Sequence, residues 1–290
     1  MRAHIGITLG DPAGLGPEIV EAALKSGRLP DDVHYRVIGE YPPCSPGSPT
    51  PETARAAAAA LHEAVDLAIR GVIDGVVTGP IHKARMYDVG FRFPGQTEFF
   101  AELTGTSNYA MLLTGGQLTV ALVTAHVSLR RVPELLSKAE IVRVGLLLSE
   151  FLRRRLRRPA RVAVAGLNPH AGESGTMGTE EAFVIAPAVE ELRGLARVGA
   201  TFDGPFSPDT VFNRAIAGEY DGVLCMYHDQ GLIPLKLHAF DEGVNVTLGL
   251  PFPRTSPDHG TAFEIAGKGL ARPDSMIAAL NLAAELAARE

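Results

Sequence analysis

Three histidines follow apolar segments whose composition is typical of buried β-strands. His126 comes after LTVALVTA, His170 after VAVAGLNP and His228 after GVLCMY. Ligands of open α/β sheets bind at the carboxyl ends of the strands, so we expect the three rings to gather there. Three neutral imidazoles suit Zn²⁺ or a similar divalent transition ion and leave a coordination position for substrate. The pattern therefore predicts a metal site, although each histidine alone would be an ordinary structural residue.

Other histidines have a weaker context. His82 stands at a fourth strand end and is an alternative ligand, but its neighbour Lys83 favours an anion contact equally. His34 and His238 do not follow strands in this way, and we interpret them as structural or surface residues.

Anion-binding groups are expected near His228. Lys236, Asn245 and Arg254 lie on or after neighbouring strands, and we expect Arg254 in a Pro-bounded loop. An arginine can bind a phosphate or carboxylate through two parallel hydrogen bonds. Lys236 could equally be a surface lysine. Asp209, in the turn SPD, is either a helix N-cap or a general base.

Two glycine-rich segments could approach a ligand closely. GDPAGLGPE, residues 10–18, joins a strand to a helix in an anion-cradle geometry, but it is equally well explained as a tight turn. DHGTAFEIAGKG, residues 258–269, is expected to form a loop and a short helix.

Strands and helices are expected to alternate along most of the chain. Helices are predicted at 51–70 and 132–155, and a hairpin-like pair of strands at 109–114 and 118–124. This alternation predicts an α/β fold with a mostly parallel sheet, some antiparallel strands and a second subdomain.

Composition excludes several classes of protein. The 290 residues carry a net charge of −6, so neither a nucleic-acid partner nor a membrane is expected, and no apolar run is long enough to span a bilayer. The run Arg153 to Arg158 is interpreted as a solvated helix end. Two cysteines without metal-type spacing, and no leader segment, favour a reducing cytoplasmic setting.

A set of motifs spread over most of the chain resembles the PdxA family, the 4-hydroxythreonine-4-phosphate dehydrogenases of pyridoxal phosphate synthesis. The matching runs are GDPAGLGPE, VTGPIHK, GQTEFF, LNPHAGE, GTEE, MYHDQG, GVNVTLGLPFPRTS and DHGTAFEIAGKG. The last also resembles the adenine-side loop of isopropylmalate and isocitrate dehydrogenases, which share the family's fold. In two places the chain departs from the family pattern. Residue 96 is Gln where the motif usually has His, and the connector at 41–51 is shorter.

The resemblance implies an isopropylmalate/isocitrate dehydrogenase-like fold with the active site in a cleft between two subdomains. Residues 1–95 with 250–290 would form the cofactor side, and residues 96–249 the metal, substrate and dimerisation side. A homodimer with a shared site is implied. The implied site residues are the metal ligands His126, His170 and His228; the substrate contacts Gln96, Thr97, Lys236, Asn245 and Arg254; the catalytic candidates Asp209 and Lys236; and the cofactor contacts Asp258, His259, Gly260, Thr261 and Ala262.

The expected reaction is a metal-dependent oxidation by NAD or NADP. It would convert 4-phosphooxy-L-threonine to 3-amino-2-oxopropyl phosphate with loss of CO₂, with Zn²⁺ as the ion and Mg²⁺ or Co²⁺ as alternatives. Family relatives also oxidise four-carbon acid-sugar phosphates and dihydrodiols, so these substrates remain alternatives. Two more distant alternatives are a three-histidine zinc hydrolase or lyase and a non-catalytic phosphate-binding protein.

Overall fold

Alternating strands and helices build two α/β units, and the computed structural model describes residues 2–195 and 199–288. Unit 1 comprises residues 1–107 and 244–290, and unit 2 comprises residues 108–243. The chain therefore leaves unit 1 after residue 107 and returns to it at residue 244. No helix among the described residues is long and apolar enough to cross a membrane.

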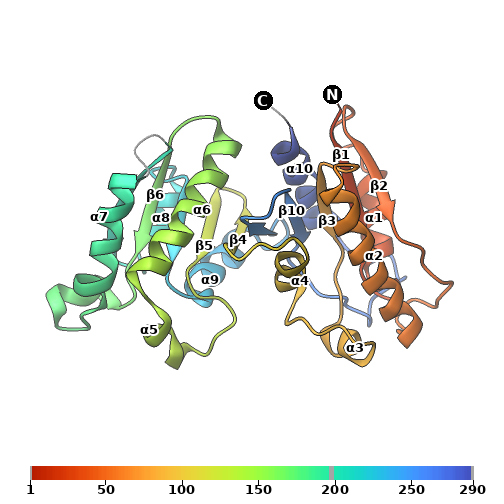
Figure 1. Cartoon of the computed structure of the whole chain (residues 1–290), viewed down its shortest axis with the longest axis horizontal. Helices are drawn as coiled ribbons and strands as arrows, with labels where there is room; N and C mark the ends of the chain where they lie inside the picture. The colour runs from red at the N-terminus through yellow and green to blue at the C-terminus, as the bar shows by residue number, and fades with distance from the viewer. Residues whose placement is uncertain (1, 196–198, 289–290) are drawn as a thin grey trace. The chain divides into compact units, whose positions relative to one another are not determined.

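The sheet of unit 1 has the strand order β2-β1-β3-β10-β9. The strands β2, β1, β3 and β10 run parallel, and β9 is antiparallel to β10. Helices α1 and α10 lie on one face of this sheet and α2 on the other (Figure 1). The elements are β1 His4–Thr8, α1 Gly16–Leu24, β2 His34–Ile38, α2 Pro51–Ile69, β3 Gly75–Thr78, α3 Lys83–Asp88, α4 Gln96–Leu103, β9 Val244–Leu248, β10 Arg254–Pro257 and α10 Asp274–Ala287.

The sheet of unit 2 has the strand order β4-β5-β8-β6-β7. Here β5, β8, β6 and β7 are parallel, whereas β4 and β5 form the predicted antiparallel hairpin. Apolar side chains of α8 and α9 pack with those of β5, β8 and β6 in one core cluster. The elements are β4 Ala110–Gly115, β5 Leu118–Leu122, α5 Val132–Leu135, α6 Lys138–Leu156, β6 Ala160–Ala165, α7 Ala186–Leu195, β7 Ala200–Phe206, α8 Val211–Ile216, β8 Gly222–Cys225 and α9 His228–Ala239.

The boundaries between the units differ from the expected ones. Division after residues 95 and 249 would have assigned α4 and β9 to the second unit. Phe99 and Phe100 of α4 are instead fully buried with Leu61 and Val76 in the core of unit 1. Strand β9 pairs with β10 in the same unit. Packing of large aromatic side chains, which the motif GQTEFF does not reveal by itself, decides the boundary.

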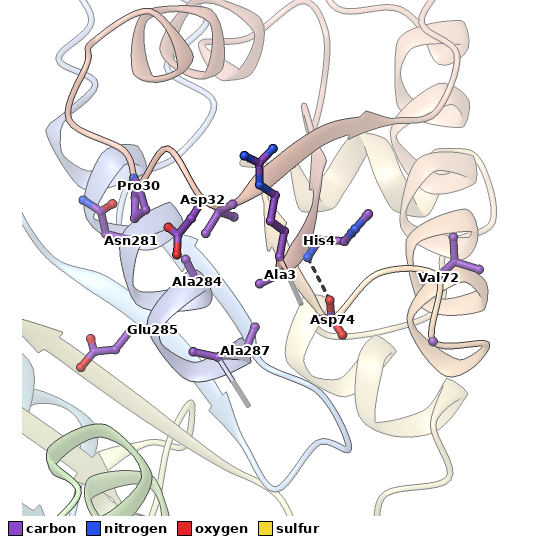
Figure 2. A pocket seen from close by; sticks show the side chains of 14 residues that line it. Ala3, His4, Pro30, Asp32, Val72, Asp74, Asn281, Ala284, Glu285 and Ala287 are labelled. Atoms are coloured by element: carbon purple, nitrogen blue, oxygen red, sulfur yellow. Dashed lines mark hydrogen bonds between the residues drawn. The ribbon is translucent and has the colours of Figure 1, made fainter. Parts of the chain in front are cut away.

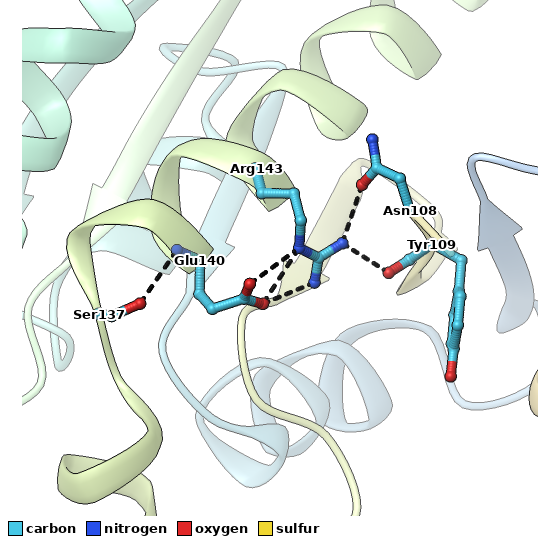
Figure 3. Close-up of polar contacts among 5 residues, drawn as sticks. All are labelled: Asn108, Tyr109, Ser137, Glu140 and Arg143. Carbon is cyan, nitrogen blue, oxygen red and sulfur yellow. Dashed lines mark hydrogen bonds and ion pairs between the residues drawn. The ribbon is translucent and has the colours of Figure 1, made fainter. Parts of the chain in front are cut away.

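Helix ends follow the local sequence closely. At α2, Thr50 and Thr53 form a capping box and Pro51 takes the first helical position. The predicted helix at 132–155 is interrupted, because Leu136 is extended and Ser137 caps a new helix by accepting a hydrogen bond from the Glu140 N–H. Figure 3 shows Arg143 of this helix bound to Glu140, to Asn108 and to the Tyr109 carbonyl, which holds the residues just before β4.

Three further predictions of local structure were wrong or incomplete. Arg254 does not lie in a loop but begins strand β10. The short helix expected within residues 258–269 is a series of turns. The segment after His228, which gave no helical prediction, forms α9 although it contains Pro234.

Candidate active site

The three histidine-bearing strands are neighbours in the sheet of unit 2. Strand β8 lies between β5 and β6 and is parallel to both, so the segments that carry His126, His228 and His170 leave the same edge of the sheet. The topology therefore brings the three histidine-bearing segments to one edge of the sheet.

His126 and His228 face each other at this edge. Their ring centroids are 5.5 Å apart, and His228 Nδ1 lies 2.7 Å from the Asp229 carboxylate. Two imidazoles on one tetrahedral zinc ion have centroids roughly 5 Å apart, because each Zn–N bond is about 2 Å long. A carboxylate on one ring nitrogen orients the other nitrogen toward a metal. The pair thus has the donor chemistry and the spacing of two ligands to one ion.

His170 is not part of that pair. Among the described residues, no group of three or more His, Cys, Asp or Glu side chains has the spacing of a metal site. His170 lies in the turn at 169–175, where residues 170–174 all have positive φ angles. Such a left-handed run is costly for residues with a Cβ atom and persists only where surrounding contacts impose it.

Asp209 lies close enough to His170 for their charges to interact. A hydrogen bond from the Ser207 hydroxyl is the main cause that holds the pKa of Asp209 below its ordinary value, and the charge of His170 contributes. The residue before α8 is Thr210, and no side chain caps that helix. The N-cap alternative for Asp209 is therefore wrong.

Unit 1 contains a buried cation. Arg254 is only 3% exposed, and its guanidinium donates hydrogen bonds to the hydroxyl oxygens of Thr78 and Thr247 and to Gln96 Oε1. Burial lowers the pKa of Arg254 to about 10, against an opposing contribution from Glu98. The side chain therefore stays charged at neutral pH, although no acidic oxygen is among its hydrogen-bond partners in the described residues.

Two of the predicted substrate contacts in unit 1, Gln96 and Thr97, are linked to this guanidinium by hydrogen bonds. Gln96 bridges Arg254 and the Gly79 carbonyl, at 2.9 and 3.0 Å. The hydroxyl of Thr97 contacts that of Thr247 at 3.3 Å. Asn245, on the neighbouring strand β9, has a buried Oδ1 with no hydrogen-bond partner in the part of the chain that the structure describes. Lys236 belongs to unit 2 and lies in α9, the helix that begins at His228.

The loop that was expected to contact the cofactor packs against the turn at residues 10–18. The Leu15 N–H donates to the Thr261 carbonyl, and Glu18 accepts from the Gly267 N–H. A Cβ atom added at Gly14 would lie 2.9 Å from the Thr261 carbonyl oxygen, so this close approach requires glycine. The Asp258 N–H donates a hydrogen bond to the Ser275 hydroxyl oxygen, and the buried His259 Nε2 has no hydrogen-bond partner among the described residues. Gly260 and Ala262 flank Thr261 in the same loop.

The remaining histidines lie elsewhere. His82 precedes α3 with its ring 5.7 Å from that of Phe263, His34 is close to His4, and His238 contacts Gln117. A cavity of about 900 Å³ lies at the amino ends of β1 and β3. Its lining includes His4, Asp32 and Asp74, which Figure 2 shows. It lies at the edge of the unit 1 sheet where the parallel strands begin, so it is not the predicted site.

Sequence reasoning missed several polar residues that hold these groups. Thr78 and Thr247 bind Arg254, but each reads as an ordinary strand residue. Gln230 and Glu181 are buried next to the ends of β8 and β6. Their only sequence signal was membership of the motifs MYHDQG and GTEE.

Comparison with known proteins agrees with these motifs. The model of the family described as pyridoxal phosphate biosynthetic protein PdxA matches residues 18–283. The chain belongs to the PdxA family. The 4-hydroxythreonine-4-phosphate dehydrogenase of Desulfosudis oleivorans is 46% identical, and the alignment covers 99% of this chain and 97% of that protein.

Solved structures of PdxA relatives and of other enzymes share the architecture. The crystal structure of 4-hydroxythreonine-4-phosphate dehydrogenase from Klebsiella pneumoniae has a TM-score of 0.83 at 37% identity, covering 99% of this chain and 100% of that one. A terephthalate 1,2-cis-dihydrodiol dehydrogenase from Burkholderia xenovorans has a TM-score of 0.71 at 26% identity, covering 98% of both chains. Isocitrate dehydrogenase from Methylococcus capsulatus, at 17% identity and a TM-score of 0.52, covers 95% of this chain and 83% of its own and shares the fold, as predicted.

Proposed function

We propose that this PdxA family member is a 4-hydroxythreonine-4-phosphate dehydrogenase. It oxidises the secondary alcohol of 4-phosphooxy-L-threonine, and the resulting 3-oxo acid loses CO₂ to give 3-amino-2-oxopropyl phosphate. The hydride goes to NAD⁺ or NADP⁺, and the proton released from the hydroxyl balances the one taken up on decarboxylation. The names of relatives that match nearly the whole chain support this activity.

The buried guanidinium of Arg254 is the observation that carries the proposal. A charged side chain is almost never fully buried without an opposite charge, because desolvation of an unpaired ion is costly. The hydrogen bonds of Arg254 go to neutral oxygens of Thr78, Gln96 and Thr247. A phosphate or carboxylate of the substrate would supply the negative charge that none of these hydrogen-bond partners carries, and Thr97 and Asn245 would add polar contacts.

A divalent ion, with Zn²⁺ favoured over Mg²⁺ or Co²⁺, would be held by His126, His228 and His170. The facing rings of the first two and the carboxylate behind His228 support this assignment. When bound, the ion would polarise the substrate oxygen as a Lewis acid. Asp209 remains ionised because its pKa is lowered, so it can accept a proton only from a hydroxyl that is already acidified. Lys236 is the second candidate for proton transfer.

The nicotinamide cofactor would bind along Asp258, His259, Gly260, Thr261 and Ala262. The packing of this loop on the glycine-rich turn at residues 10–18 supports that role, since both segments bring backbone close to one place. A bound nicotinamide would accept the hydride.

We further propose a cytoplasmic homodimer. Helix α9 carries Ile233 and Leu237, and its C-cap residue Phe240 continues the same helical spacing; the three are 65%, 87% and 74% exposed. Such a stripe is unfavourable in water and fits a second copy of the chain. The same helix begins at His228 and carries Lys236, so a partner seated there would adjoin the metal site. The two cysteines, which form no disulfide, suit a reducing compartment.

Replacement of Arg254 tests the proposed phosphate-binding role. Losing charge-assisted hydrogen bonds costs on the order of 2–3 kcal/mol, so Arg254→Met should lower kcat/KM roughly a hundredfold. Its melting temperature should not fall greatly, because the variant no longer buries a charge. Arg70→Met, at an exposed ion pair with Asp66, is the matched control. An unchanged kcat/KM in Arg254→Met would contradict the role.

A substrate panel tests the related activity. The 26% identity to a dihydrodiol dehydrogenase makes a non-phosphorylated substrate the second candidate. We expect turnover of 4-phosphooxy-L-threonine, and none of 4-hydroxythreonine or a dihydrodiol. Equal rates with and without the phosphate would favour the second candidate.

A further inference from the structure

The strand ends that carry the three histidines are joined by buried hydrogen bonds. On one side, both the N–H and the hydroxyl of Thr124 donate to the Met226 carbonyl, at 3.2 and 2.8 Å. Thr124 and Met226 each lie two residues before a histidine, His126 and His228. The backbone ladder between β5 and β8 thus continues beyond the last paired residues of the strands.

The connection from β8 to β6 is different, because a side chain makes it. The ladder between these strands ends where Val164 pairs with Leu224. Beyond that point, Gln230 Oε1 accepts a hydrogen bond from the Met226 N–H at 2.6 Å, and Gln230 Nε2 donates to the Gly166 carbonyl at 2.7 Å. The side-chain amide of Gln230 therefore bridges the segments after β8 and β6, where their backbones no longer pair.

The position of Gln230 is closely determined. It is 6% exposed and lies in the first turn of α9, two residues after His228. The next residue is Gly231, where an added Cβ would lie 3.1 Å from Val120, Leu122 and Cys225 side-chain atoms. The start of α9 is consequently packed directly on β5 and β8, and the amide of Gln230 cannot move without losing both bonds.

The loop after β6 has a second anchor. Glu181 is 5% exposed, and its Oε1 accepts hydrogen bonds from the backbone N–H groups of Leu167 and Asn168, both at 2.7 Å. Its Oε2 accepts from the Asn168 side chain at 2.9 Å. Gly166 and Asn168, held by Gln230 and Glu181, immediately precede the left-handed run that begins at His170.

We propose that Gln230 is a positioning residue that fixes the ends of β8 and β6, and thereby the relative placement of His228, His126 and His170. Glu181 holds the far side of the same loop. Neither side chain is proposed to contact metal or substrate. The role of this placement in catalysis rests on the proposed metal-dependent activity. The effect of Gln230 on the backbone at the strand ends can be measured without a metal.

Two variants of Gln230 separate its bonds. Gln230→Met is close in size and removes both hydrogen bonds. Gln230→Glu keeps an acceptor for the Met226 N–H but places a carboxylate oxygen against the Gly166 carbonyl, so it should release mainly the β6 side. Thr119→Val is the control, because it removes a buried hydrogen bond between Thr119 of β5 and Thr114 of β4, away from the histidine edge.

Hydrogen–deuterium exchange of the full-length protein without added metal is the deciding measurement. Residues 123–128, 165–172 and 226–231 should exchange faster in Gln230→Met, and residues 165–172 should be the most affected in Gln230→Glu. Exchange elsewhere should match that of the wild type. Unchanged exchange at these three segments would overturn the proposal. An increase in exchange that is spread over all of unit 2, or that Thr119→Val reproduces at the same segments, would overturn it too.

Metal affinity provides the second readout. Partners that orient metal ligands typically change affinity by about 10- to 100-fold, so Zn²⁺ or Co²⁺ should bind Gln230→Met at least about tenfold more weakly. Thr119→Val should bind as the wild type does. Wild-type affinity in Gln230→Met would contradict the positioning role even if exchange changed. A wild-type protein that binds neither ion would instead refute the metal site, and the exchange pattern would still decide what Gln230 does.

Discussion

At the scale of single residues, Gln96 connects the anion-binding group to the backbone of unit 1. Its amide accepts from Arg254 and donates to the Gly79 carbonyl, so it orients the guanidinium. Gln96→Ala should therefore raise KM for the phosphorylated substrate about tenfold with little change in melting temperature. A fall in melting temperature with an unchanged KM would show that Gln96 only supports the helix it begins.

Two isosteric or larger replacements sharpen this test. Gln96→Glu places a carboxylate on Arg254, which would compete with the substrate anion and raise KM further than Gln96→Ala does. Gln96→His should keep activity and bind substrate more tightly as the pH falls below the imidazole pKa, ordinarily about 6.5. The neighbouring Arg254 charge would shift that gain to still lower pH.

The residue types at the site were predictable, but their surroundings were not. The strand-end positions of His126, His170 and His228 followed from the apolar segments before them. That Arg254 is buried could not be predicted, because its local sequence PFPRTS resembles a loop. Only the pairing of β10 with both β3 and β9 places it inside unit 1.

At the scale of elements, strand β6 is held at its start by an ion-pair cluster. Asp221 accepts hydrogen bonds from two guanidinium nitrogens of Arg158 and from the Arg161 N–H. Burial pushes the pKa of Asp221 upward, but these bonds and the arginine charges outweigh burial and leave that pKa below its usual value of 3.8.

This depressed pKa predicts how stability depends on pH. A carboxyl group whose pKa is lower in the folded state stabilises the protein above its unfolded pKa, and the effect is lost as the pH falls through the folded value. The free energy of unfolding should thus decrease below about pH 3.8 by a component that Asp221→Asn lacks. Asp66→Asn, at an exposed ion pair, should keep the wild-type profile. Identical acid profiles for Asp221→Asn and the wild type would contradict this account.

Elements were predictable where patterns were regular. The helix predicted at 51–70 is α2, and the predicted pair of strands at 109–114 and 118–124 is the β4–β5 hairpin. Helix α9 was missed because Pro234 interrupts its sequence and apolar residues occupy both its buried and its exposed faces. A helix cannot be recognised from the spacing of its apolar residues when both its buried and its exposed faces are apolar.

At the scale of the whole molecule, the exposed apolar stripe formed by Ile233, Leu237 and Phe240 should form the dimer interface. Leu237→Asp places a charge in the centre of the exposed stripe and should convert a dimer to a monomer in analytical ultracentrifugation. Glu242→Ala, a change beyond the stripe, should leave the mass unchanged. A wild-type protein that sediments as a monomer, or a dimeric Leu237→Asp, would exclude this surface as the interface.

We propose that this family member is a metal-dependent dehydrogenase of a phosphorylated hydroxyamino acid. The most direct measurement begins with purified enzyme from which a chelator has removed bound metal. 4-Phosphooxy-L-threonine and NAD⁺ are added first and Zn²⁺ afterwards, while the formation of NADH and CO₂ is followed. We predict no product before the ion is added, equal amounts of NADH and CO₂ afterwards, and no recovery in His228→Ala. Full activity of the stripped wild type, or of His228→Ala, would contradict the account.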